Sequence, residues 1–382
     1  MVNQDQPQHP PNNKETAMFF RAIEDFTPAN VTRALEALQP GVQVAEVAIL
    51  SQHQGSASHL LIENTYAPGA DCGLPPRMFV KTSLDASRDA LPSGFADTLA
   101  GELALTMYVS EVKAYALINA EMDIEAPKIF ALDLGEAAGD FYLFMENLTE
   151  RGAICPKVIP ALEVGRIENL LTNLARLHAA YWQSPRLGGD LGWLEASTEG
   201  KLSQFLRKGG WDPIATEFQI PYKAAILKDI GIDAEHMYQA FWRRQEALNQ
   251  WPQTLLHGDA HPGNIYFLPD GQVGLLDWQL ARRGPWAHDV SYAIISALDP
   301  DDRRRCERDM LRDYRAELTR LGVANPPSED DLWLAHRQTP AWGVPMWGST
   351  PAVMYSQEEV ETVVRRFGTA WVDFDTSGAL GI

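Results

Sequence analysis

The sequence predicts an α+β fold in which strands dominate the first part and helices dominate the rest. Before residue 148, short apolar runs with alternating character are separated by polar loops, which is typical of strands. After that point, apolar residues recur at the three- and four-residue spacing of amphipathic helices, most clearly between Val164 and Tyr181. We therefore expect a small sheet-containing part followed by a larger, mainly helical part.

Bulk composition limits the classes of partner. The chain has 382 residues and a formal net charge of −19, from 51 acidic and 32 basic residues. This balance argues against a nucleic-acid or membrane partner, because both favour basic patches. Three cysteines (Cys72, Cys155 and Cys306) lie far apart, which is no disulfide framework and fits a reducing compartment. No long apolar run occurs, so we expect a soluble cytoplasmic protein of unknown oligomeric state.

The first part begins with a polar, Pro-rich stretch, residues 1–13, which we expect to be a disordered tail. Thr27-Pro28 predicts a helix start, with Thr27 as N-cap. Strands are expected over residues 42–49 and 59–65. The loop between them contains Gly55 and Ser56, whose backbone amides can approach phosphate oxygens closely. With one glycine only, that loop is weak evidence by itself.

A third strand, Met78 to Lys81, ends in a lysine and is followed by a helix expected over residues 100–120. This helix carries two candidate partners for the lysine, Glu102 and Glu111. The apolar stretch from residue 140 to residue 148 predicts another strand that turns polar at its end. In the second part we expect helices over residues 164–181 and 234–250, one beginning at Asp289, one after Asp299, and a last one opened by Ser356 and Glu359 as a capping box. Residues 184–233 are rich in Gly and Pro and are expected to be irregular.

The chemical centre is the stretch from Leu255 to Gln279, LLHGDAHPGNIYFLPDGQVGLLDWQ. Two short apolar runs flank Pro-Asp-Gly, a sequence that favours a tight turn and so predicts a hairpin. A hairpin brings Asn264, before its first strand, beside Asp277, after its second strand. Asp259 lies in the loop next to them.

These side chains suit a hard divalent cation, because Mg²⁺ prefers one or two protein oxygens together with phosphates. The spacing His257-x-Asp259-x-x-x-x-Asn264, followed by an Asp after an apolar strand, is typical of a kinase catalytic loop and metal site. Phosphoryl transfer requires this arrangement. The spacing of His257, Asp259 and His261 could instead hold a hydrolase metal, so this second interpretation stays open.

The stretch resembles the aminoglycoside phosphotransferase and choline kinase superfamily, whose loop reads HGDxHxxN and whose metal aspartate precedes Trp. The Asp-Trp-Gln at 277–279 is most similar to the ecdysteroid-kinase-like branch. The resemblance implies a bilobal, protein-kinase-like fold. Residues 14–147 would form an N-lobe that covers ATP, and residues 148–382 would form a C-lobe with the catalytic loop, metal site and acceptor pocket.

The resemblance also implies roles for individual residues. Asp259 would accept the proton of the attacking hydroxyl, and Asn264 and Asp277 would hold Mg²⁺. Lys81, held by Glu111 rather than Glu102, would bind the ATP phosphates. The backbone of Glu146 and of Leu148 would bind the adenine edge. Supporting roles fall to three residues: His257 fixes the loop, Asp289 accepts hydrogen bonds from it, and His178 is a packed histidine that braces it.

The acceptor is expected to be a small molecule, because the segment after Asp277 is short and has no Ala-Pro-Glu closing an activation loop. A Trp-rich segment, residues 339–348, is expected to be irregular. Its Trp342 and Trp347 either line the acceptor pocket, where they could face a quaternary ammonium, or pack on the last helices. Three classes therefore compete: a small-molecule kinase, a nucleotide-binding pseudokinase or scaffold, and a metal-dependent hydrolase.

Overall fold

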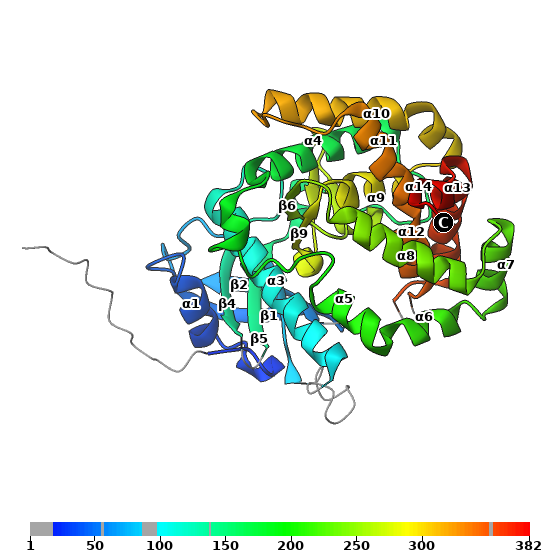
Figure 1. Cartoon of the computed structure of the whole chain (residues 1–382). Helices are drawn as coiled ribbons and strands as arrows, with labels where there is room; N and C mark the ends of the chain where they lie inside the picture. The colour runs from blue at the N-terminus through cyan, green and yellow to red at the C-terminus, as the bar shows by residue number, and fades with distance from the viewer. Residues whose placement is uncertain (1–17, 55–56, 86–97, 137–138, 351–353) are drawn as a thin grey trace, which may run out of the picture.

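The computed structural model describes residues 18–54, 57–85, 98–136, 139–350 and 354–382 (Figure 1). The expected tail, residues 1–13, and the loop residues Gly55 and Ser56 lie outside these ranges. No helix in the described part of the chain is both long and apolar enough to cross a membrane.

The first part of the chain forms a five-stranded sheet in which all neighbours are antiparallel. The strand order is β1-β2-β3-β5-β4. The strands are β1 (Val44–Gln54), β2 (Ser58–Tyr66), β3 (Arg77–Thr82), β4 (Ile129–Gly135) and β5 (Asp140–Glu146). The strands expected from the apolar runs at 42–49, 59–65, 78–81 and 140–148 are all present within a few residues.

Helices cover both faces of this sheet. The helix α1 (Pro28–Glu36) packs on one face, where Met78 and Val80 of β3 point into a buried cluster. The helix α3 (Leu99–Glu121) packs on the other face, against Leu143 and Phe141 of β5. Because side chains alternate along a strand, Lys81 lies on the face opposite to Val80. Its side chain therefore points toward α3 and the helical part of the molecule.

The second part is mainly helical and lies on the α3 side of the sheet (Figure 1). Its helices are α4 (Val164–Tyr181), α5 (Lys201–Phe205), α6 (Trp211–Glu217), α7 (Pro221–Asp229), α8 (Ala234–Leu248), α9 (Ala287–Ala297), α10 (Pro300–Arg320), α11 (Glu329–Gln338), α12 (Pro340–Gly348), α13 (Gln357–Phe374) and α14 (Thr376–Leu380). Two short antiparallel ribbons sit among them: β6 (Gln253–Leu256) pairs with β9 (Arg282–Pro285), and β7 (Ile265–Phe267) pairs with β8 (Val273–Leu275). Single turns complete the fold: η1 (Ile23–Asp25), η3 (Leu148–Arg151), η4 (Pro185–Gly188), η5 (Leu206–Gly210), η6 (Pro262–Asn264) and η7 (Trp278–Leu280).

Several helix starts follow the capping chemistry of the sequence. Thr27 accepts a hydrogen bond from the amide of Asn30 at the start of α1. Ser356 and Glu359 form a complete capping box at the start of α13, with each side chain bonded to the other's backbone amide. The predicted α+β fold, with a small antiparallel sheet followed by a larger, mainly helical part, is confirmed.

Two expectations of irregular structure were wrong. Residues 184–233 contain the helices α5, α6 and α7, and the Trp-rich segment 339–348 contains α12. The helices α7 and α12 each have a proline in the first turn, Pro221 and Pro340. Proline has no backbone N–H, but an N–H in the first turn has no partner within the helix, so no helical hydrogen bond is lost. These prolines begin helices rather than interrupt them.

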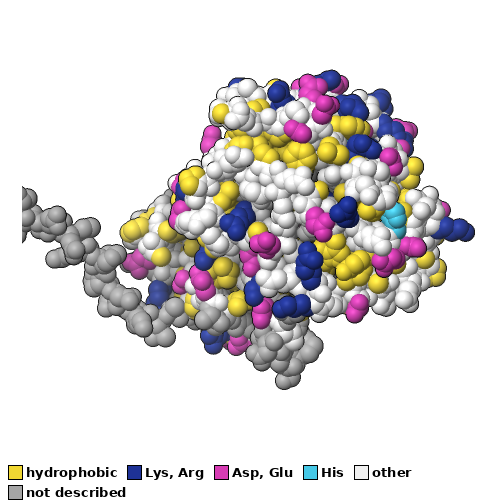
Figure 2. Space-filling model, viewed as in Figure 1, with side chains coloured by type: hydrophobic (Ala, Val, Ile, Leu, Met, Phe, Trp, Pro, Cys, Tyr) yellow, Lys and Arg dark blue, Asp and Glu magenta, His cyan; other side chains and the backbone are white. Residues whose placement is uncertain are grey.

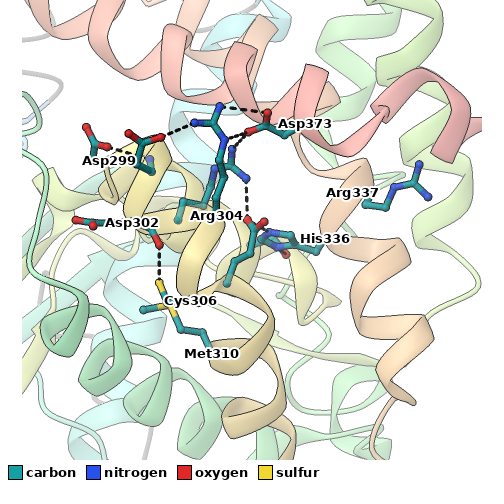
Figure 3. A network of polar contacts seen from close by, with 12 residues as sticks. Asp299, Asp302, Arg304, Cys306, Met310, His336, Arg337 and Asp373 are labelled. Carbon is teal, nitrogen blue, oxygen red and sulfur yellow. Dashed lines mark hydrogen bonds and ion pairs between the residues drawn. The ribbon is translucent and has the colours of Figure 1, made fainter.

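The surface in Figure 2 carries acidic and basic side chains interspersed over the face shown. A denser polar network ties α10 to α11 and α13 (Figure 3). In it, the buried Arg303 pairs with Glu307 (2.8 Å) and with Asp373, and Glu307 also contacts His336 (3.2 Å). This network joins α10, α11 and α13, which all pack against α9. The helix α9 borders the site described next.

Candidate active site

The hairpin formed by β7 and β8 brings the two expected metal-binding residues together. The amide of Leu276 donates to the carbonyl oxygen of Asn264 (2.8 Å), so the residue before β7 lies beside the end of β8. The turn is closed by Leu268 and Gln272 (2.9 Å), with Gly271 at a φ of +89°. The positive φ explains why the turn has glycine at this position.

Asp259 lies in the loop between β6 and η6, and both of its carboxylate oxygens are held. The side-chain amide of Asn264 donates to Oδ2 (3.1 Å) and to the backbone oxygen of Asp259 (3.0 Å). The hydroxyl of Tyr292 donates to Oδ1 (3.1 Å). Burial alone would raise the pKa of this carboxyl, but His261, His257 and the hydroxyl of Tyr292 together lower it to about 2. Asp259 is therefore an ionised carboxylate over the whole physiological range.

Asp277 follows β8 in a left-handed conformation, with φ 58° and ψ 75°, which is uncommon for a residue other than glycine. Its Oδ1 is buried and has no hydrogen-bond partner among the described residues, and it lies 3.6 Å from the ammonium of Lys81. Apart from this ion pair with Lys81, the oxygen accepts no hydrogen bond from the described residues and can serve as a ligand to a cation. Together with the side-chain oxygen of Asn264, it fits the oxygen ligand set of a magnesium ion.

Lys81 on β3 pairs with Glu111 on α3 at 2.8 Å, and both side chains are buried. Glu111 and Asp277 together raise the pKa of Lys81 above its usual value, although burial opposes them. Glu102, the other candidate, instead pairs with Lys201 at 2.5 Å. The structure thus joins Lys81 to Glu111 and excludes Glu102 from this position.

A chain of buried polar groups supports the loop from behind. Asp289, on α9, accepts hydrogen bonds from the amides of His257 (2.7 Å) and Gly258 (2.9 Å). His178 on α4 contacts Asp289 (3.2 Å) and the hydroxyl of Tyr314 (2.8 Å). Asp289 thus contacts the backbone of the loop directly, and His178 contacts the loop only through Asp289.

His257 uses both ring nitrogens within the protein. Nε2 contacts the carbonyl oxygen of Leu276 (2.7 Å), and the backbone amide of Asp259 donates to Nδ1 (3.2 Å). Burial lowers the pKa of His257, so it is neutral. Since neither nitrogen is available to a metal, the arrangement argues against the hydrolase interpretation. Within the described ranges, no group of three or more His, Cys, Asp or Glu side chains could hold a metal ion.

The strand expected over residues 140–148 ends where its sequence turns polar: β5 ends at Glu146, and the short turn η3 begins at Leu148. The side chain of Glu146 pairs with Arg151 (3.2 Å), which also pairs with Glu125 (2.8 Å). These side chains fasten the segment that joins the sheet to the helical part. The nucleotide contacts expected of Glu146 and Leu148 involve backbone atoms, and these side-chain contacts do not test them.

The two tryptophans of α12 differ in position. Trp347 lies next to the site: its ring packs against His261 (5.0 Å between centroids), and its indole donates to the hydroxyl of Tyr292 (2.7 Å). Trp342 is buried and stacks on Phe241 (5.6 Å), with Arg244 5.6 Å from its ring centre. These contacts favour the packing alternative for Trp342, and a role of Trp342 in an acceptor pocket stays a prediction.

Tyr292 was missed in the sequence. It lies on α9 three residues after Asp289, which places both side chains on one face of the helix. That spacing is the signal that could have identified it.

Comparison with known proteins decides the family. Residues 88–323, more than half of the chain, match the model of the phosphotransferase enzyme family. The chain belongs to this family. The finer expectation of an ecdysteroid-kinase-like branch stays a prediction.

Curated relatives of this phosphotransferase family member include two homoserine kinases. That of Sinorhizobium medicae (strain WSM419) is 25% identical over 178 residues, and that of Rhizobium meliloti (strain 1021) is 26% identical over 178 residues. Each match covers 41% of this chain and 51% of the relative, so the chain spans about half the length of the curated relatives it matches.

Solved structures similar to the chain include a microcompartment-associated aminopropanol kinase, at 14% identity and a TM-score of 0.47, covering 91% of this chain and 98% of that one. A choline kinase from Streptococcus pneumoniae is similar at 12% identity and a TM-score of 0.42, covering 87% of this chain and 97% of that one.

Proposed function

We propose that this chain transfers the γ-phosphoryl group of ATP, bound with Mg²⁺, to a hydroxyl group of a small molecule. The observation that carries the proposal is the convergence of Lys81, Asp259, Asn264 and Asp277 at one site. Lys81 lies 3.6 Å from Asp277, and Asn264 lies 3.1 Å from Asp259. These residues come from the sheet, the loop and the hairpin, and membership of the phosphotransferase family supports the same chemistry.

In this proposal Lys81 binds the phosphates of ATP. Its ammonium is fixed by Glu111 at 2.8 Å, so the charge is held in place before the nucleotide arrives. Asn264 and Asp277 would hold Mg²⁺ through their side-chain oxygens. When bound, the ion supplies positive charge that offsets the charge developing on the phosphate oxygens.

Asp259 orients the acceptor hydroxyl and takes its proton. As the acceptor oxygen forms a bond to the γ-phosphorus, the bond to the bridging oxygen of ADP breaks and ADP leaves with its electron pair. With a pKa of about 2, Asp259 is a weak base, so its main contribution is to hold the hydroxyl in line. Proton transfer would follow late, when the acceptor oxygen has become acidic.

We infer that residues 14–147 form the nucleotide-covering lobe and residues 148–382 the lobe that carries catalysis. The end of β5 at Glu146 supports this boundary. The backbone of Glu146 and of Leu148 would bind the adenine edge, and Gly55 and Ser56 would cover the phosphates.

The test of the proposal is Asp259→Asn. This change keeps the shape of the side chain and removes its negative charge. We expect turnover to fall by about 100-fold or more, since general-base groups contribute about 10²–10⁴-fold, while ATP affinity stays near the wild-type value. Turnover is measured as ADP release and affinity by calorimetry. Wild-type turnover in Asp259→Asn would show that Asp259 is not the proton acceptor.

The acceptor can be sought by a thermal-shift screen in the presence of Mg²⁺ and a non-hydrolysable ATP analogue. Amino alcohols such as homoserine belong in the first plates, because the curated relatives are homoserine kinases. Aminoglycosides, sugars, sterols and macrolides complete the screen. A pseudokinase, the main alternative, would bind the nucleotide but release no ADP with any acceptor.

A further inference from the structure

The helix α9 carries two side chains that reach the catalytic loop from the same face. Asp289 holds the loop's backbone, at the amides of His257 and Gly258. Tyr292, one turn later, reaches past that backbone to the carboxylate of Asp259, and its hydroxyl lies 3.1 Å from Oδ1. Tyr292 is only 4% exposed, so water does not compete for its hydroxyl. One helix therefore positions both the main chain and the acidic side chain of the loop.

The direction of the Tyr292 hydroxyl is set by Trp347. The indole Nε1 lies 2.7 Å from the tyrosine oxygen, and an indole N–H can only donate. It occupies an acceptor site on the tyrosine oxygen and leaves the O–H to donate to Asp259. Trp347 is itself 3% exposed and is held by ring contacts to His261 (5.0 Å) and Tyr355 (5.2 Å).

The remaining carboxylate oxygen is held separately. Asn264 donates to Oδ2 of Asp259 at 3.1 Å, so the carboxylate plane is fixed at both oxygens. The side chain of Asp259 is still 28% exposed, so an acceptor hydroxyl can reach it. A carboxylate fixed at two points presents its free lone pairs in a defined direction.

We propose that Tyr292, oriented by Trp347, is a positioning residue that aims the carboxylate of Asp259 at the acceptor hydroxyl. This inference rests on the proposed phosphotransferase function. It assigns to α12 a part in catalysis through a hydrogen-bond relay, Trp347 to Tyr292 to Asp259, rather than through contact with the acceptor.

The first experiment is a double-mutant cycle on ADP release from Mg-ATP, with water as the acceptor. We expect Tyr292→Phe to lower kcat about 10-fold with little change in the KM for ATP, because binding groups are untouched while the geometry of Asp259 is loosened. Trp347→Phe should lower kcat about 3-fold. In the double variant, Trp347→Phe should add nothing to the effect of Tyr292→Phe, because Trp347 acts through the hydroxyl that is already missing.

The double variant also guards against misfolding, since it removes both partners of a buried hydrogen bond and leaves no unpaired donor. Tyr142→Phe, at a buried tyrosine on the far side of the sheet, is the matched control and should keep wild-type turnover. Wild-type kcat in Tyr292→Phe, or effects of the two changes that simply multiply, would overturn the relay.

A second readout does not depend on turnover. It is a double-mutant cycle on the free energy of unfolding at one fixed pH, with Tyr292→Phe and Asp259→Ala made singly and together. If the Tyr292 hydroxyl donates to Asp259, the double variant should lose less stability than the sum of the two single losses, because the second change removes a contact that is already gone. Additive losses would contradict the relay even if the wild type releases no ADP, whereas a lack of ADP release with every acceptor would contradict the proposed function alone.

Discussion

At Gly258 the catalytic loop lies very close to a neighbouring backbone segment. Its φ is +86°, and a Cβ added there would collide with the carbonyl oxygen of Leu280. Its amide and its carbonyl are both bonded, to Asp289 (2.9 Å) and to His288 (3.1 Å). Glycine is therefore needed here for two reasons: the two backbone segments lie too close for a Cβ, and φ is positive.

We predict that Gly258→Ala lowers ADP release by at least about 10-fold, because the added methyl group pushes the loop away from Leu280 and displaces Asp259. The matched control is Gly271→Ala. That glycine has a similar φ of +89°, but an added Cβ meets only the Asn169 side chain at 3.9 Å. Equal loss of activity in both variants would show that strain at positive φ, and not the collision, is responsible.

At this scale the sequence predicted one contact and left others open. The pairing of Lys81 with Glu111 rather than Glu102 could be predicted because a motif carried it. The contact of Tyr292 with Asp259 could not, and the choice between the two alternatives for Trp342 stayed open, because both depend on how α9 and α12 pack and no local pattern encodes that packing. A tryptophan in a core and a tryptophan in a pocket look alike in a sequence.

Among the elements, α10 is held to α13 by charge as well as by apolar packing. Arg303 is buried and pairs with Glu307 on its own helix and with Asp373 on α13, and Arg304 also pairs with Asp373 (2.8 Å; Figure 3). Removing one partner of a buried ion pair leaves an uncompensated charge, which costs more than the pair itself contributes.

We predict that Asp373→Ala lowers the free energy of unfolding by about 2 to 3 kcal/mol. This is less than the ~3–5 kcal/mol for breaking a fully buried pair, because Asp373 is partly exposed and Arg303 keeps Glu307. Asp301, an exposed partner of Arg304 at 2.7 Å, is the control, and Asp301→Ala should cost less than about 1 kcal/mol. Denaturant titration measures both changes. Equal effects would show that Asp373 acts as an ordinary surface partner.

The strongly periodic elements were predictable and the Pro- and Gly-rich ones were not. The helix α4 has the predicted bounds, Val164–Tyr181, because its apolar stripe is regular and buried. In α12, Pro345 lies inside the helix, and the tryptophans on several sides leave no clear stripe. A helix buried on all sides shows no amphipathic pattern, so its sequence resembled a loop.

For the whole molecule, the cluster behind the catalytic loop makes stability depend on pH. His288 is buried against Arg244 (3.5 Å) and donates to the carbonyl of Gly258. Burial, together with Arg282 and Arg244, lowers the pKa of His288 from 6.5 to about 3. Since the folded pKa is lower than the unfolded one, the folded state is favoured above pH 6.5, and this contribution is lost as the pH falls toward 3.

We predict that His288→Gln weakens the fall in unfolding free energy between pH 6.5 and pH 4, since the glutamine amide can still donate to Gly258 and does not titrate. A pKa difference of this size corresponds to a few kcal/mol, on the order of 1.4 kcal/mol for each pH unit crossed. Identical profiles for the wild type and His288→Gln would contradict a titrating role for His288.

The overall architecture was predictable because several independent signals agreed: strand alternation before residue 148, helical periodicity after it, and a hairpin motif between them. The convergence of Lys81 with Asp277 followed only from the family resemblance. Nothing local in the sequence places residues almost two hundred positions apart within 3.6 Å of each other.

The most direct test of the central claim is calorimetric titration of the protein with a non-hydrolysable ATP analogue, with and without Mg²⁺. If Asn264 and Asp277 hold the ion across from Lys81, the wild type should bind the analogue about 10-fold or more tightly with Mg²⁺, a difference of about 1.4 kcal/mol. Asp277→Ala should bind it equally weakly in both conditions. Equal affinity of the wild type with and without Mg²⁺, or an unchanged Mg²⁺ effect in Asp277→Ala, would contradict the account.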